Sequence, residues 1–424
     1  MANEAGGEPK GLLDIESTGH ENIPLTARLS WLCSTVSKFV KGGTYLLAGE
    51  AGIGKSTLAL QIALDLGVAG AQTVYMHTEQ SAADLKERAQ LLVSGIPKAD
   101  RELALSNVKP VDWHYEHSQL GSFLAREVLG REAPYTNAVL VVLDSIQGHG
   151  LSSAATKQFN HIYAFCREAK AAGIATLLVG HVTKRGGIAG PKTLEHNVDC
   201  ILYFRKAFRY RPLFVPKNRF GPARLKPIPL EMDRKTTELR VSAHSETLSA
   251  VARSFLGKPH GDVEAQAAVA LPTYGSRGRI TAPGLPKKEV EQLLSCLSQL
   301  EEVDIEDLSF TIQCRLPGER VYRALLGLPL AMALLSSYLQ REIPSHHMYL
   351  GELDLQKRVR EVPDVLIEEL WESVEDGTLS TPLRLYCPKE SASLVREGLR
   401  DATVVACETL EDVVFKTWPD LAPR

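Results

Sequence analysis

The sequence predicts an α/β protein whose mainly parallel sheet is covered by helices on both faces, followed by a smaller α+β domain. Over the first half of the chain, short apolar runs bounded by glycine alternate with longer amphipathic segments. Continuous apolar strands, rather than alternating ones, are typical of a parallel sheet buried on both faces. The alternation of apolar runs and amphipathic segments ends at residues 246–262, and a different pattern follows. A chain of 424 residues is long enough for two or three domains, each with its own core.

The first domain is expected over residues 23–245, after a mobile leader at 1–22 that is rich in Gly and Glu. Three short segments at its end, separated by Pro and basic residues, suit a hairpin-like edge of the same sheet; they are 200–205, 213–216 and 228–232. Before them, strands are expected at 44–48, 73–77, 138–143 and 175–179, and helices at 56–66, 82–93, 119–129 and 156–172.

A linker is expected at residues 246–262, where Gly257, Pro259 and Gly261 cluster. The second domain then covers residues 263–424, with helices expected at 287–297 and 322–340.

The composition excludes several classes of protein. Hydrophobic residues make up 44% and charged residues 23% of the chain, which is typical of soluble globular proteins and not of disordered or fibrous ones. The longest apolar run, 325–335, is too short to span a bilayer, and residues 1–10 lack the apolar segment of a secretory signal. The 7 cysteines never form a CxxC pair. We therefore expect a cytoplasmic protein with no membrane association, no disulfide framework and no zinc site.

The net charge of −3 does not point to nucleic acid, but the charge is unevenly distributed. Residues 181–240 contain 14 Lys or Arg and 5 Asp or Glu, a surplus of +9, which leaves −12 for the rest of the chain. This segment is a candidate for contact with phosphates, and a solvated charged face explains the surplus equally well.

The strongest motif has the pattern GxxxxGK[ST], directly after an apolar strand and before a helix, as a phosphate-binding loop requires. Glycines let backbone N–H groups turn toward phosphates, and the helix N-terminus adds positive dipole. Lys55 is expected to neutralise β- and γ-phosphate charge, and the Ser56 hydroxyl to ligate Mg²⁺. The predicted site for ATP and Mg²⁺ comprises Gly49, Glu50, Ala51, Gly52, Ile53, Gly54, Lys55, Ser56 and Thr57.

Two carboxylates follow other expected strands. Asp144 ends the apolar run 139–143, where the acidic partner of the metal belongs, so it is assigned to Mg²⁺ with Ser56; the alternative is a capping Asp. Glu79 follows the strand at 73–77, where a carboxylate can polarise water beside the γ-phosphate. A surface Glu that begins a helix is the competing interpretation.

Five motifs, read in order, resemble the RadA/Sms family of bacterial RecA-like ATPases. They are 49–57 (GEAGIGKST), 78–81 (TEQS), 143–147 (LDSIQ), 179–184 (VGHVTK) and 217–221 (KNRFG); the segment 190–199 (GPKTLEHNVD) is also similar. KNRFG is the most discriminating. The resemblance covers residues 23–233 and implies a RecA-like P-loop core that forms hexameric rings. It further implies translocation on single-stranded DNA and help with recombination intermediates in DNA repair, with a recombinase or helicase as candidate partner.

The resemblance also implies roles for catalytic residues. Glu79 would be the general base that activates water, acting with Lys55 and Asp144. Lys217 and Arg219 would reach the ATP of a neighbouring subunit and stabilise charge on the transferring phosphoryl group. Without the resemblance, these two cations would be interpreted as solvated charges.

His181 would lie near the γ-phosphate as a sensor; the alternative is a core histidine hydrogen-bonded to backbone. The glycine-rich loop that carries Lys184, Arg185 and Lys192 matches the DNA-facing loop of the family. Spaced cations among flexible glycines suit contact with a phosphate backbone without base readout.

Two departures from the family stand out. The family usually carries an N-terminal four-cysteine zinc module, and no cysteine precedes Cys33, so that module is expected to be missing. Residues 333–337 and 351–355 resemble, more weakly, the Lon-protease-like domain of the family, which would occupy 263–424. That alignment puts Leu325 at the nucleophilic serine and Leu366 at the general-base lysine, so no peptidase activity is expected.

The sequence therefore favours an ATP-driven, ring-forming DNA motor of the RadA type. An ATP-gated oligomeric scaffold that never engages DNA is the alternative, favoured by the acidic balance outside residues 181–240. A regulatory RecA-like ATPase of the circadian-clock type is a third interpretation, and the KNRFG and GHVTK strings match it less well.

Overall fold

The computed structural model describes residues 21–113, 116–147, 155–182, 193–205, 210–242, 249–300, 303, 305, 308–314 and 323–422. The chain divides into two compact units. Unit 1 contains the chain up to residue 205 with 213–225 and 232–240, and unit 2 contains 206–212, 226–231 and 241–424. No helix among the described residues is long and apolar enough to cross a bilayer.

Unit 1 is built on a sheet in the order β3-β2-β4-β5-β1-β6-β7-β8; of the last strand, β8, residues 224–225 belong to unit 1. The neighbouring strands β3, β2, β4, β5, β1 and β6 all run parallel, and β7 is antiparallel to β6. This confirms the predicted α/β class with a mainly parallel sheet. The strands are β1 (Thr44–Gly49), β2 (Gln72–His77), β3 (Val108–Asp112), β4 (Ala138–Asp144), β5 (Ala175–His181), β6 (Cys200–Phe204), β7 (Leu213–Asn218) and β8 (Arg224–Ile228). Two short strands follow in the chain, β9 (Leu230–Met232) and β10 (Leu239–Val241).

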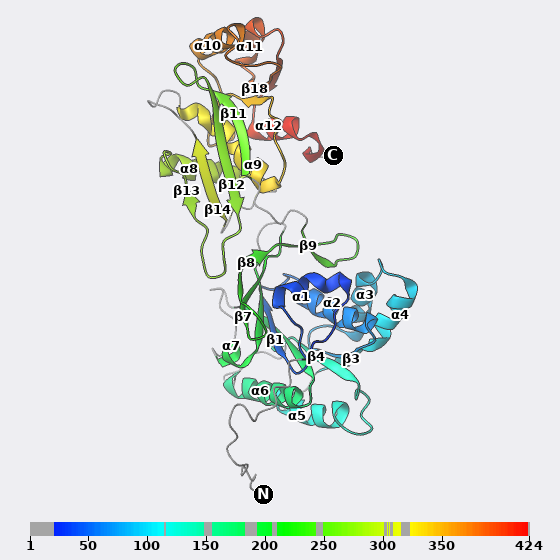
Figure 1. Ribbon diagram of the computed structural model, residues 1–424. Coiled ribbons are helices and arrows are strands. Elements are labelled where there is room, and N and C mark those ends of the chain that lie inside the picture. Colours follow the sequence, from blue (N-terminus) through cyan, green and yellow to red (C-terminus); the bar gives the residue numbers. More distant parts are fainter. Residues whose placement is uncertain are drawn as a thin grey trace. The chain divides into compact units, whose positions relative to one another are not determined.

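Helices cover the sheet of unit 1 as two groups (Figure 1). The first group is α2 (Lys55–Val68), α3 (Ala82–Leu92) and α4 (Lys98–Asn107), and the second is α5 (Leu120–Phe123) and α6 (Ala155–Ala171). Two further helices are α1 (Ser30–Val36) and α7 (Thr193–Asn197). Because both faces are covered, every residue of β1 is buried, which explains why these strands are continuously apolar.

The parallel strands bring the predicted site to one edge of the sheet. Gly49 at the end of β1 lies beside His181 at the end of β5, and His77 at the end of β2 lies beside Asp144 at the end of β4. Ligands of open α/β sheets bind at this carboxyl edge.

The KNRFG segment lies at the opposite end of the parallel strands, where β1 and β6 begin. Because β7 is antiparallel to β6, Asn218 near its end pairs with Cys200 at the start of β6. Cys200 in turn lies beside Tyr45, near the start of β1.

The structure of unit 1 contains elements that the sequence analysis did not predict, among them α1, α7, β8 and β10. Helix α4 and strand β3 were not predicted; β3 contains Pro110 and is half-exposed at the edge of the sheet, where a proline costs no ladder hydrogen bond. The helix predicted at 119–129 is divided into a 3₁₀ turn, the short α5 and a π-helical turn over Leu124–Val128.

Unit 2 contains a second sheet, in the order β13-β14-β12-β11-β15-β18-β19, with mixed strand directions. Its strands are β11 (Ser249–Phe255), β12 (Asp262–Ala270), β13 (Ile280–Thr281), β14 (Ser309–Cys314), β15 (His347–Tyr349), β18 (Arg384–Pro388) and β19 (Thr403–Cys407), and β16 (Glu352–Leu353) pairs separately with β17 (Val359–Arg360). Helices are α8 (Lys287–Leu297), α9 (Gly327–Leu339), α10 (Asp364–Glu375), α11 (Ala392–Gly398) and α12 (Leu410–Thr417).

Part of the expected linker at 246–262 belongs to this sheet. Ser249–Phe255 forms β11, paired along its whole length with β12, so the expectation of a connecting segment was wrong there. The turn between these strands contains the Gly257, Pro259 and Gly261 cluster, with Gly257 and Gly261 at positive φ. The turn signal was real, but it marked a hairpin.

Candidate functional site

The loop between β1 and α2 has a backbone that only glycine adopts easily. Gly52 and Gly54 have φ angles of 72° and 105°, in the left-handed region. Gly49 is restricted for a different reason, because a Cβ there would lie 2.8 Å from the Cβ of Phe204. These three glycines let the loop curl tightly before α2 begins at Lys55.

The Lys55 ammonium lies inside this loop. Its Nζ donates to the carbonyl oxygens of Gly49 at 2.9 Å and Glu50 at 2.7 Å. It also lies 3.4 Å from Nδ1 of His181, which can only act as acceptor toward an ammonium. Burial lowers the pKa of Lys55, and the nearby carboxylates of Asp144 and Glu79 oppose that shift. The result is a desolvated cation at a helix N-terminus, an arrangement suited to phosphate.

Asp144 and Ser56 form the second part of the site. Ser56 Oγ donates to Asp144 Oδ1 at 3.0 Å, and Tyr75 donates from its hydroxyl to Asp144 Oδ2 at 2.5 Å. Burial raises the pKa of Asp144, while the hydrogen bonds from Tyr75 and Ser56 oppose the rise. A hydroxyl and a carboxylate in contact are hard oxygen donors, which fit Mg²⁺.

Glu79 lies at the same edge and is not an isolated surface residue. Ser145 Oγ donates to Glu79 Oε1 at 2.8 Å, and His181 Nε2 lies 3.7 Å from the same oxygen. The Glu79 side chain is 53% exposed, so solvent reaches it.

His181 is not the core histidine of the alternative interpretation. Its side chain is 35% exposed, and its two ring nitrogens face Lys55 and Glu79. Its backbone N–H donates to Gln147 Oε1 at 3.0 Å, which holds the end of β5.

Hydrogen bonds also hold the turn that carries Glu79. Thr78 donates from its backbone N–H to the Asp144 carbonyl at 2.9 Å and accepts from the Ser145 N–H at 3.1 Å. His77 contacts the Gln80 carbonyl through Nδ1 at 2.8 Å, so this ring nitrogen carries the proton.

Sequence reasoning assigned no role to Tyr75, Ser145 or Gln147. Ser145 and Gln147 belong to the LDSIQ motif, and this was the available signal. Tyr75 lies within an apolar strand, where a buried tyrosine gives no signal of its own.

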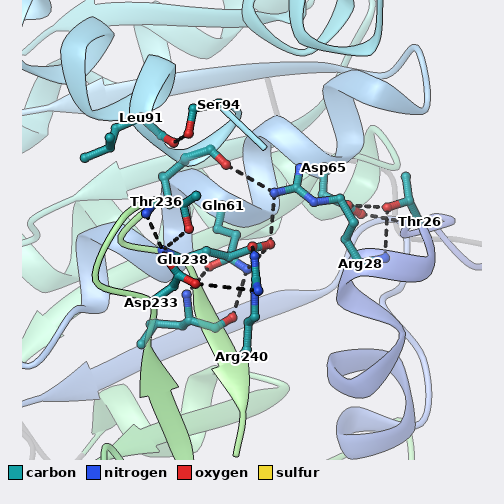
Figure 2. A network of polar contacts seen from close by, with 12 residues as sticks. Thr26, Arg28, Gln61, Asp65, Leu91, Ser94, Asp233, Thr236, Glu238 and Arg240 are labelled. Carbon is teal, nitrogen blue, oxygen red and sulfur yellow. Dashed lines mark hydrogen bonds and ion pairs between the residues drawn. The ribbon is translucent and has the colours of Figure 1, made fainter. Parts of the chain in front are cut away.

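A polar network holds the middle and the C-terminal half of α2 (Figure 2). The Gln61 side-chain amide donates to the Leu239 carbonyl and accepts from its N–H, both at 3.0 Å. Asp65 accepts from the Thr26 N–H at 2.7 Å, and Arg28 Nη2 donates to Glu238 Oε1 at 2.9 Å. The helix that begins at the phosphate loop is therefore also held at Gln61 and Asp65.

Lys217 and Arg219 lie near the start of β6, at the end of the parallel strands opposite to the phosphate loop. Lys217 Nζ donates to the carbonyl oxygens of Glu195 and His196 in α7, the latter at 2.9 Å. Arg219 Nη1 donates to Asp199 Oδ1 at 3.2 Å. The structure does not bring these cations to the phosphate loop of their own chain.

The remaining site predictions fall elsewhere. Lys184, Arg185 and Lys192 lie outside the described residues. In unit 2, Leu325 is 4% and Leu366 is 1% exposed, and both pack in the apolar core, where neither side chain carries a reactive group.

The chain is similar to a family of ATPase domains and to several DNA repair proteins. The model of the AAA domain family matches residues 16–187. The chain is 30% identical over 343 residues to the DNA repair protein RadA of Campylobacter jejuni, covering 76% of this chain and 71% of the relative. It is 30% identical over 340 residues to RadA of Helicobacter pylori, with 77% and 71% covered. RadA of Listeria monocytogenes is 28% identical over 400 residues, with 90% and 81% covered.

Among solved structures, an isolated ATPase domain aligns with a TM-score of 0.43 and 13% identity, covering 52% of this chain and 92% of that one. A KaiC-like protein from Pyrococcus horikoshii aligns with a TM-score of 0.42 and 17% identity, covering 53% and 99%.

Proposed function

The chain belongs to the RadA family, and from this premise we propose that it is an ATP-hydrolysing, ring-forming DNA motor. It would act on single-stranded DNA or branched recombination intermediates in DNA repair and recombination. The observation that carries the proposal is the convergence of Lys55, Ser56, Asp144, Glu79 and His181 at one sheet edge.

Each of these side chains has a part in hydrolysis. Lys55 would bind the β- and γ-phosphates, and Ser56 with Asp144 would hold Mg²⁺, which neutralises phosphate charge when bound. Glu79 would take the proton from water as the water oxygen bonds to the γ-phosphorus and the bond from that phosphorus to the bridging oxygen breaks. Ser145 and His181 would hold Glu79 in place for this transfer.

The position of Lys217 and Arg219 supports a composite site between subunits. From Tyr45, beside the start of β6, to Gly49 at the phosphate loop, β1 spans about 13 Å at roughly 3.3 Å per residue. Cations at that edge cannot serve their own phosphate loop without leaving Asp199 and α7. In a homo-oligomer, which we take to be a hexamer, they would meet the ATP of the next subunit.

We extend the proposal to the organisation of the chain. Residues 23–245 would be the RecA-like ATPase domain. Residues 249–424, which include β11, would be a Lon-protease-like domain without peptidase activity that helps hold the ring. The basic surplus at 181–240 and the names of the relatives support contact with DNA through Lys184, Arg185 and Lys192. A recombinase or helicase is the candidate protein partner.

An ATP-gated scaffold that does not translocate is the second candidate. It is favoured by the charge of −12 that remains outside residues 181–240, which would repel DNA over most of the chain.

The ATPase rate with and without single-stranded DNA, measured over a range of salt concentrations, separates the two. A motor should hydrolyse ATP faster with DNA, and the DNA affinity should fall as salt rises. Charge reversal at Lys184, Arg185 and Lys192 should flatten that dependence, by about 0.7 to 0.9 in slope per lost contact. Reversal at Lys98, Lys287 and Lys288, which lie on α4 and α8, is the matched control. No salt-dependent DNA binding by the parent in the presence of ATP would favour the scaffold.

A further inference from the structure

Tyr75 is a buried tyrosine whose hydroxyl is aimed at the metal side of the site. It lies in β2, beside β4, and is 0% exposed. Its hydroxyl donates to Asp144 Oδ2 at 2.5 Å and lies 3.4 Å from the Ser56 carbonyl oxygen. One side chain therefore contacts both residues to which Mg²⁺ is assigned above.

The two carboxylate oxygens of Asp144 have different partners. Oδ1 accepts from Ser56 and Oδ2 accepts from Tyr75. Rotation of the carboxylate about its last bond would break both hydrogen bonds. The Tyr75 hydroxyl thus holds the plane of the carboxylate, with Oδ1 directed toward Ser56.

We propose that Tyr75 is a positioning residue that sets the affinity of the nucleotide site for divalent cation. By fixing Asp144 through Oδ2, it keeps Oδ1 and the Ser56 hydroxyl directed at one point. Partners of this kind typically change metal affinity by roughly 10- to 100-fold when removed. The inference rests on the proposed assignment of Mg²⁺ to Ser56 and Asp144.

Tyr75→Phe tests the hydroxyl, because the buried ring stays and only one oxygen is lost. The measurement is the affinity of the purified full-length protein for a fluorescent ADP analogue, titrated with Mg²⁺ from zero. Tyr75→Phe should need roughly tenfold more Mg²⁺ to reach half of the metal-dependent gain in affinity. The affinity without Mg²⁺ should equal that of the parent.

Tyr45→Phe is the matched control. Tyr45 is also 0% exposed and lies on β1, but its hydroxyl accepts from the Val40 N–H at 2.7 Å and donates to the Lys38 carbonyl at 3.3 Å, away from Asp144. Losing that hydroxyl should leave the Mg²⁺ midpoint unchanged.

Asp144→Asn separates this inference from the proposed function. If Asp144→Asn shifts the Mg²⁺ midpoint and Tyr75→Phe does not, the positioning role is wrong while the site assignment stands. If Asp144→Asn has the parent midpoint, the site assignment fails and the inference fails with it. Weaker binding of Tyr75→Phe at every Mg²⁺ concentration alike would indicate a structural role and also overturn it. When Tyr75→Phe is combined with Asp144→Asn in one chain, the Mg²⁺ midpoint should be the same as for Asp144→Asn alone.

Discussion

Ser145 donates a hydrogen bond of 2.8 Å from Oγ to Oε1 of Glu79, joining the end of β4 to the turn after β2. This bond orients a carboxylate that is otherwise half exposed. It also makes Glu79 a good test residue, because a glutamine oxygen can accept the same hydrogen bond.

Glu79→Gln should bind ATP as the parent does and hydrolyse it more slowly by roughly 10² to 10⁴-fold. The amide keeps the contact to Ser145 but cannot take a proton from water. Nucleotide affinity and single-turnover hydrolysis, measured on one preparation, check this prediction. Hydrolysis at the parent rate would show that Glu79 is not the base.

Lys55→Ala should abolish ATP binding and leave the fold intact. The Lys55 ammonium contacts loop carbonyls and His181, so its loss removes phosphate neutralisation. Isothermal titration with ATP is the measurement, and circular dichroism is the control for folding. ATP affinity near that of the parent would contradict the phosphate-loop assignment.

Mixing two inactive variants tests whether Arg219 acts on a neighbouring subunit. Arg219→Ala subunits still carry Glu79, and Glu79→Gln subunits still carry Arg219. In an equal mixture, random pairing around a ring would make roughly a quarter of the interfaces complete, so about a quarter of the parent activity should return.

The control is one chain with both changes, which has no complete interface when mixed with itself. Native mass spectrometry confirms that the rings are mixed. If Arg219→Ala alone is inactive, a confirmed mixture without activity would mean that Arg219 acts within its own chain.

Gln61→Ala should destabilise unit 1 at a distance from the phosphate loop. Gln61 pairs with both the N–H and the carbonyl of Leu239, and both residues are buried. Losing partners for two buried backbone groups should lower the free energy of unfolding by about 2 to 4 kcal/mol. Urea unfolding measures it, with the exposed Gln292→Ala in α8 as control. An unchanged midpoint would contradict the anchoring role of Gln61.

His347 should make the stability of unit 2 depend on pH. Burial, with the nearby charges of His346 and Arg384, lowers the pKa of His347 to about 4. The unfolded chain, in which a histidine has a pKa of about 6.5, then binds more protons than the folded one between these values. Neutral His347 therefore contributes to the free energy of unfolding of unit 2 above pH 6.5, and this contribution is lost as the pH falls toward 4.

The expected loss is roughly 1 to 3 kcal/mol over that window. Thermal unfolding between pH 4 and pH 7 measures it. His347→Gln should remove most of the slope, whereas His161→Gln, in α6 of unit 1, should not. Equal slopes in the parent and His347→Gln would show that other groups govern the acid response.

The sequence by itself determined the fold class of unit 1 and the loop at 49–56. Periodicity and glycine spacing can be recognised within a short stretch of sequence. Strands that are buried on both faces consist of continuous runs of apolar residues, as in β1, β4 and β5. Edge strand β3, with its proline and half-exposed residues, leaves no such trace. The hairpin strand β11 was hidden by the turn signal that follows it.

Only the tertiary structure decided which side chains meet. The order β2-β4-β5-β1 places the ends of four strands together, so Glu79, Ser145 and His181 touch although up to about a hundred residues separate them in the chain. The antiparallel return of β7 carries Lys217 and Arg219 to the other edge. Neither pairing order nor strand direction is encoded in a local pattern. Tyr75 was invisible for the same reason, since its partner Asp144 lies on another strand.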